Sequence, residues 1–121
     1  MYIKEEIGHV LKELGIPTSL LGYKYAKRAI ELVASTKKKL SMTKEIYPTI
    51  AKEYDATSSR VERAIRHAID IGWCRGNPDM LYHLFRHSYS AEKGRPTNSE
   101  FITAVAEFVV NKCSNEHAVL S

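Results

Sequence analysis

The chain has 121 residues, of which 44% are hydrophobic and 26% are charged, and its formal net charge is +4 at pH 7. This size and balance are those of one folded globular domain, and they exclude an intrinsically disordered chain. No apolar run approaches the roughly 20 residues that span a bilayer and no signal-peptide core is present, so we expect one cytoplasmic domain over residues 1–121 that binds no membrane.

Apolar residues that recur every three or four positions predict six helices and no strand, which is an all-α fold. The first helix is expected over Glu5–Leu14, with Gly15 as its C-terminal cap. The second is expected from Thr18 to about Ser35, and a run of three lysines follows it, Lys37, Lys38 and Lys39. These lysines suit contacts to phosphates, although solvating a loop at a helix C-terminus is the commoner role of such a run.

The middle of the chain has the spacing of a helix-turn-helix, in which the second helix enters the major groove by its N-terminal residues. The first helix of the pair begins at Thr43 or, because Pro48 lies within the segment, near Tyr47. The second is expected over Thr57–Arg75. Asp55 stands in the turn where many such motifs carry Gly, and Asp tolerates a left-handed backbone better than most residues. Apolar side chains are placed to pack the two helices together: Ile50, Ala51, Tyr54, Val61 and Ile65.

The polar face of the Thr57–Arg75 helix is cationic and carries Arg60, Glu62, Arg63, Arg66 and His67. Between Lys37 and Arg75 nine basic residues stand against five acidic ones, so positive charge concentrates around the helix-turn-helix, as phosphate binding requires. A charged face that is merely solvated remains the plain alternative. Glu62 has two open roles, because it can accept a hydrogen bond from a base or complete a Ser59-x-x-Glu62 capping box.

Stop and start signals define the last two helices. Gly76, Asn77 and Pro78 end one helix and begin the fifth, expected over Asp79–Phe85. After a polar loop, the capping box Thr97-x-x-Glu100 begins the sixth helix, and residues 115–121 are expected to fray.

No grouping of residues predicts catalysis, a cofactor or a metal site. His83 and His87 have the spacing of a metal-binding pair, but no third ligand accompanies them. Cys74 and Cys113 are expected to be buried free thiols. The chain is therefore predicted not to be an enzyme, and the alternative to a DNA-binding domain is a helical module that binds protein or RNA.

Four motifs are more specific than helical periodicity: Tyr47-Pro48-x-Ile50-Ala51, Ser59-Arg60-Val61-Glu62-Arg63-Ala64-Ile65-Arg66-His67-Ala68-Ile69, Arg75-Gly76-Asn77 and Arg95-Pro96-Thr97-Asn98-Ser99-Glu100-Phe101-Ile102. With them, the chain from about Ile7 to Val110 closely resembles the C-terminal DNA-binding domain of the sporulation master response regulators of endospore-forming bacteria. The resemblance implies a six-helical effector domain of a phosphorelay transcription factor, which in the family follows a receiver domain that is absent from this chain.

The resemblance also implies partners and site residues. The family binds short promoter boxes in double-stranded DNA, pairs as a homodimer on tandem boxes, activates or represses transcription, and contacts the sigma factor of RNA polymerase. Carried over by position, Arg60, Glu62 and Arg63 face base edges, and Ser59, Arg66 and His67 lie near phosphates; Lys38 is a further phosphate candidate. Because Glu can accept from cytosine N4, this placement favours base contact for Glu62.

Two stretches of the chain, residues 78–86 and 88–92, depart from the family pattern. They lie where the resemblance places the polymerase contact. We expect the isolated domain to be monomeric and to pair head to tail on tandem sites with its last helix involved.

Overall fold

The computed structural model describes residues 2–85 and 94–120, and within them it contains six α-helices, one π-helical segment and no β-strand. The predicted all-α fold is confirmed. In chain order the elements are α1 (Tyr2–Glu13), α2 (Leu21–Ala34), η1 (Met42–Ile46), α3 (Tyr47–Glu53), α4 (Ser58–Arg75), α5 (Pro78–Phe85) and α6 (Asn98–Leu120).

Local capping chemistry sets several helix ends where the sequence predicts them. Gly15, just past α1, has φ 80°, a left-handed conformation that costs Gly little. The Asn77 side chain accepts a hydrogen bond from the backbone N–H of Asp79 at 2.9 Å and begins α5. At the start of α6, the backbone N–H of Thr97 donates to the Glu100 carboxylate, and the Glu100 N–H donates to the Thr97 hydroxyl. The predicted capping box is therefore present.

The start of α4 corrects one alternative for Glu62. The N-cap is Thr57, whose hydroxyl accepts from the backbone N–H of Arg60 at 3.2 Å. Ser59 lies inside the helix and cannot cap it, so the Ser59-x-x-Glu62 capping box is wrong. Sequence spacing alone did not decide which residue of the Thr/Ser cluster would be the cap.

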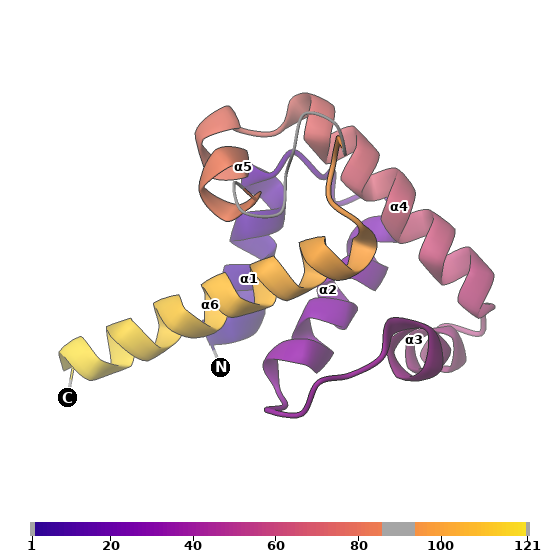
Figure 1. The fold of residues 1–121 in the computed structure, drawn as a ribbon, viewed down its shortest axis with the longest axis horizontal. Helices are drawn as coiled ribbons and strands as arrows, with labels where there is room; N and C mark the ends of the chain where they lie inside the picture. The colour runs from indigo at the N-terminus through magenta and orange to yellow at the C-terminus, as the bar shows by residue number, and fades with distance from the viewer. Residues whose placement is uncertain (1, 86–93, 121) are drawn as a thin grey trace.

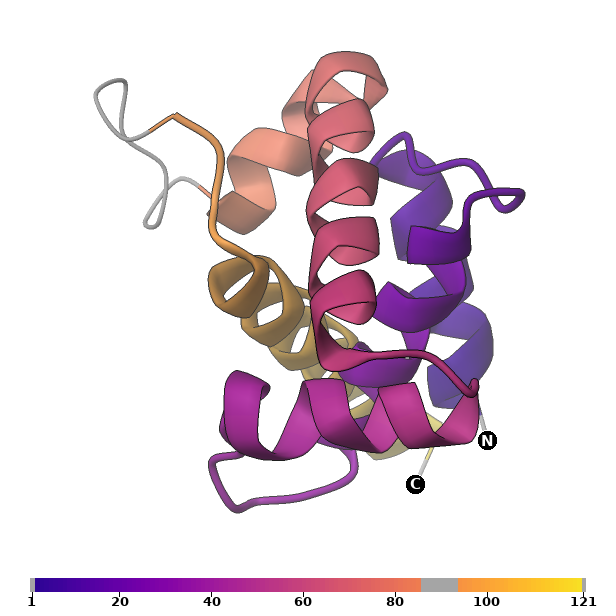
Figure 2. The same cartoon turned by 90° about the vertical axis from the view of Figure 1, so that its right-hand side faces the viewer.

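The helix-turn-helix consists of α3 and α4. Both positions suggested for the start of its first helix are partly right, because the chain is helical from Met42 but changes from π to α geometry at Tyr47, with Pro48 in the first turn of α3. Asp55, in the turn, has φ 52°, the left-handed conformation expected for it. Figure 2 shows α3 crossing beneath the N-terminal end of α4.

The core lies between α4 on one side and α1, α2 and α6 on the other (Figure 1). Gly22 allows α2 to cross close to α4, because a Cβ at this position would overlap the carbonyl oxygen of Ala64. Helix α6 packs mainly on α1 and α2 and touches α4 near its own N-terminal end (Figure 1). Fully buried side chains come from every layer, including Ile7, Leu11, Ile30, Ile50, Val61, Ile65, Phe101 and Val105.

Three details differ from the prediction or extend it. Cys74 is exposed rather than buried, because it lies off the apolar stripe of α4; Cys113 is half-buried, and no disulfide joins them. Tyr54 is 44% exposed and makes an edge-to-face contact with Tyr25 of α2. Helix α6 continues to Leu120, and fraying over residues 115–121 stays a prediction.

None of the helices in residues 2–85 and 94–120 is long and apolar enough to cross a bilayer.

Candidate nucleic-acid interface

Helix α4 lies along one side of the molecule, and Figure 2 looks directly onto its outer face over its whole length. Its inner stripe, Val61, Ile65, Ala68, Ile69 and Gly72, is buried against the body. With 3.6 residues per turn, this stripe places Arg63 near the middle of the outer face. Arg60 then lies on one flank, and Glu62 and Arg66 lie on the flank that faces α6.

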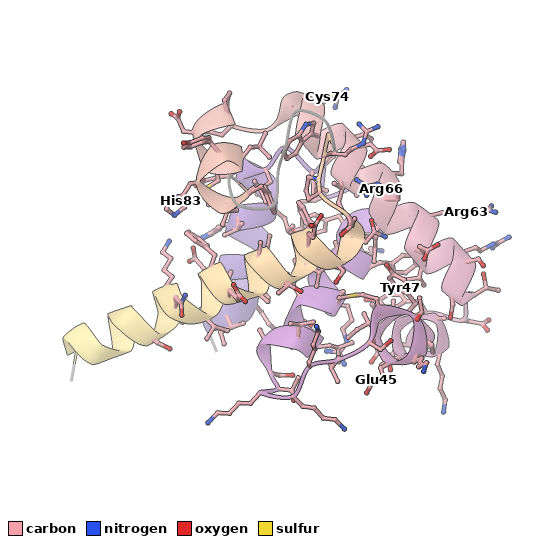
Figure 3. The ribbon with its side chains drawn as sticks, in the orientation of Figure 1. Glu45, Tyr47, Arg63, Arg66, Cys74 and His83 are labelled. Carbon is pink, nitrogen blue, oxygen red and sulfur yellow. The ribbon has the colours of Figure 1, made fainter. Side chains whose placement is uncertain are left out.

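The three predicted base-contacting side chains are exposed and available. Within residues 2–85 and 94–120, no side chain forms a hydrogen bond or ion pair with that of Arg60, Glu62 or Arg63. Figure 3 shows Arg63 extending away from the folded body. Ser59 and His67 are exposed on the same helix. Five of the predicted contact residues therefore share one accessible surface and need break no internal bond to meet a ligand.

Arg66 differs from them because it is already engaged. Its Nε donates to the Asp70 carboxylate at 3.2 Å, and its Nη1 donates to the backbone carbonyl of Pro96 at 3.0 Å. Its Nη2 is buried and meets no acceptor in the described part of the chain. Arg95 also pairs with Asp70, at 2.8 Å. Arg66 thus ties α4 to the segment that enters α6, a role that its sequence position does not reveal.

A groove of about 560 Å³ runs along the α6-facing flank of α4. Its walls come from α4, from the start of α6, and from η1 and α3; they include Met42, Tyr47, Glu62, Arg63, Arg66, His67, Thr97 and Asn98. Two of the predicted base-contacting residues and two of the predicted phosphate-contacting residues therefore lie on the rim of one concave surface.

Asn98 and Tyr47 are buried at the inner end of this groove, and sequence reasoning assigned neither a role. The Asn98 Nδ2 donates to the Tyr47 hydroxyl and to the backbone carbonyl of Glu62, both at 3.1 Å. Burial raises the pKa of Tyr47 above its ordinary value, although the hydrogen bond from Asn98 opposes the shift. In Figure 3, Tyr47 lies where α3 meets the start of α6.

Helix α3 is fixed to the body by a separate ion pair. The Arg28 guanidinium on α2 donates two hydrogen bonds of 2.9 Å to the Glu53 carboxylate at the end of α3. The hydrogen bond from Arg28 lowers the pKa of Glu53, although desolvation opposes the shift. A planar two-bond contact of this kind holds an orientation as well as a distance.

Lys38 is not brought together with the α4 residues. It is exposed in the connection between α2 and η1 and lines a different groove, between that connection and α6. His83 makes an edge-to-face contact with Phe108, and His87 lies outside the described residues. Among the residues that the structure describes, no three His, Cys, Asp or Glu side chains are grouped to hold a metal.

A comparison with protein families matches residues 7–109 to the family described as sporulation initiation factor Spo0A C terminal. The chain belongs to this family. Spo0A C-terminal domains are DNA-binding regulatory domains of a sporulation-initiation transcription factor and not enzymes, so DNA is a partner of this chain. The family assignment and the exposed cationic face of α4 thus point to the same class of ligand.

Proposed function

We propose that the domain reads a short promoter box in double-stranded DNA by placing the N-terminal turns of α4 in the major groove. The observation that carries the proposal is the set of Arg60, Glu62 and Arg63 side chains, which are exposed on the outer side of α4 and form no hydrogen bond or ion pair within the described residues. Arginine can donate two hydrogen bonds to guanine O6 and N7, and Glu can accept one from cytosine N4. These three side chains are the proposed base contacts.

Phosphate contacts are proposed for Ser59, His67, Arg66 and Lys38. Ser59 and His67 flank the base-reading residues on the exposed part of α4. The Nε and Nη1 of Arg66 already bond to Asp70 and Pro96, and its Nη2 is buried, so a phosphate oxygen must compete with those bonds. Lys38 lies on a separate element and would touch the backbone beyond the groove that α4 enters. These contacts position the protein and give affinity without sequence information.

The biological role that we propose is control of the initiation of sporulation in the cytoplasm, by activation or repression at the promoters that carry the box. Pairing of two copies on tandem boxes, with α6 involved, and contact with the sigma factor of RNA polymerase belong to the same proposal. Sedimentation of the free domain tests the pairing, because a stable dimer without DNA would contradict assembly on the sites.

The decisive experiment is selection of binding sites from a random duplex pool, followed by affinity measurements on the selected and scrambled duplexes over a range of salt concentrations. A DNA reader must prefer the selected duplex, and its affinity must fall as salt rises, because counterions are released from the phosphates. Binding that lacks both the preference and the salt dependence would favour the alternative, a module that recognises protein or RNA.

A further inference from the structure

Asn98 stands out in the described part of the chain because, apart from tyrosines, no other residue with a polar or charged side chain is buried there; only 8% of its surface is exposed. It is the first residue of α6 and lies beside the proposed DNA-reading helix. Burying a side-chain amide is unfavourable unless its hydrogen bonds are made inside the protein. The Asn98 nitrogen makes two such bonds, whereas its Oδ1 is buried and meets no donor in the described part of the chain. The partners of the nitrogen therefore indicate what the amide does.

One amide group bonds to both helices of the helix-turn-helix. The backbone carbonyl of Glu62 can only accept, so the nitrogen of the Asn98 amide must face it. The second Nδ2 hydrogen is directed to the hydroxyl of Tyr47 on α3. Asn98 thereby joins α3, α4 and α6 at a single point; its bond to Tyr47 is buried, and its bond to the Glu62 carbonyl is half-buried.

Two neighbouring contacts strengthen the same junction. Pro96 accepts from Arg66, and Arg95 pairs with Asp70, so the chain segment 95–98 bonds to α4 at three successive places along one flank. We call this segment, with its bonds to α4, the α6 clasp. The bond from Asn98 is the one nearest the N-terminal end of α4, where the proposed base contacts lie.

The position of that bond matters for recognition. Glu62 carries the anchored carbonyl, and Arg63 is the next residue, so a shift of the helix at this carbonyl displaces both side chains. Hydrogen bonds to base edges tolerate only small errors in position, about 0.5 Å for a preorganised site. The α6 clasp therefore holds α4 at the point where a small shift of the helix would cost the most discrimination between base pairs.

We propose that Asn98 is a positioning residue for DNA recognition, which touches no DNA but fixes α4 against α3 and α6 so that Glu62 and Arg63 meet their base pairs. This inference rests on the function proposed above for α4. It assigns Asn98 an effect on sequence preference that differs from a general effect on stability.

The test compares the wild-type domain with Asn98→Ala on the selected duplex and on a scrambled duplex, at a temperature at which both proteins are folded. We expect the ratio of the two affinities to fall by about fivefold or more, which is what one mismatched base pair costs. Val10→Ala, buried on α1 and outside both α6 and the clasp, controls for destabilisation, and Ser19→Ala, exposed just before α2, controls for a surface substitution. Both controls are expected to keep the wild-type ratio.

Tyr47→Phe provides a milder variant if Asn98→Ala fails to fold, because it keeps the buried ring and removes only one acceptor. We expect a smaller fall in the ratio, and no further fall when Tyr47→Phe is added to Asn98→Ala, since the shared bond is already lost. An unchanged ratio in Tyr47→Phe, or in folded Asn98→Ala, would overturn the positioning role, as would an equal fall in Val10→Ala. A wild-type domain without any sequence preference would instead refute the function proposed for α4, and the inference with it.

Discussion

Replacing Arg63 by Ala is expected to weaken binding to the selected duplex while leaving the fold intact. The side chain extends from the middle of the outer face of α4, so its removal breaks no hydrogen bond or ion pair within the described residues. Surface substitutions of this kind usually change the free energy of unfolding by less than about 0.5 kcal/mol. Loss of a two-bond contact to guanine removes about 1–3 kcal/mol of discrimination, or roughly a 5- to 150-fold change in the dissociation constant.

Fluorescence anisotropy on the selected duplex, on a scrambled duplex and on duplexes with each base pair changed in turn would measure this effect. Arg63→Ala should lose preference at one base pair and bind the other duplexes in their original order. Arg66→Ala is the matched comparison: it removes the same charge but also the bonds to Asp70 and Pro96, so it should lower the free energy of unfolding by about 1 kcal/mol or more. An equal loss by Arg63→Ala on every duplex would mean that this arginine supplies charge only, and would refute base reading.

Three other changes test separate parts of the structure. Lys38→Ala should weaken binding equally on selected and scrambled duplexes and reduce the slope of log affinity against log salt by about one, if the lysine meets a phosphate; an unchanged slope would assign it to a solvated loop. Gly22→Ala should lower the free energy of unfolding in urea by about 1–3 kcal/mol or more, because the added Cβ meets the backbone of Ala64; an unchanged midpoint would mean that α2 and α4 separate easily. The carboxylate of Glu53 has a lowered pKa in the folded state, so its pairing with Arg28 stabilises the protein above about pH 4.5 and the contribution is lost as the pH falls through the lowered value. The stability difference between wild type and Glu53→Gln should therefore be larger at pH 7 than at pH 3, and equal differences would contradict the pairing.

The fold could be predicted from the sequence because its helix ends depend on residues close together in the chain. Asn77 caps α5 by accepting a hydrogen bond from the N–H of Asp79, two positions along the chain. Thr97 and Glu100, which bond to each other, are three positions apart. The turn at Asp55 also follows from a local preference, because Asp adopts the left-handed conformation more readily than most residues. The residues that form each of these caps and turns lie within about one helical turn of one another, so they can be recognised without knowing how the helices pack.

Part of the proposed site could be predicted for the same reason. Helical periodicity separates the buried stripe of α4 from the face that carries Arg60 and Arg63, and both residues are exposed as this pattern predicts. The same periodicity, applied to Cys74, would place it off the stripe, and the expectation that its thiol is buried came from residue type alone. Composition was therefore a weaker guide there than position on the helix.

The remainder of the site depends on contacts between residues that are far apart in the chain. Arg66 and Pro96 are 30 positions apart, Asn98 and Glu62 are 36, and Asn98 and Tyr47 are 51. Periodicity gives Arg66 the appearance of another exposed cation and gives Asn98 that of an ordinary first residue of a helix. Their roles arise only when the start of α6 is brought against α4, and the same packing leaves Arg63 exposed while committing Arg66. Arg63 and Arg66 have similar positions in the sequence pattern, yet Arg63 is free to bind DNA and Arg66 holds α4 to the start of α6. A count of basic residues along α4 therefore overestimates the number of cations that are available to DNA.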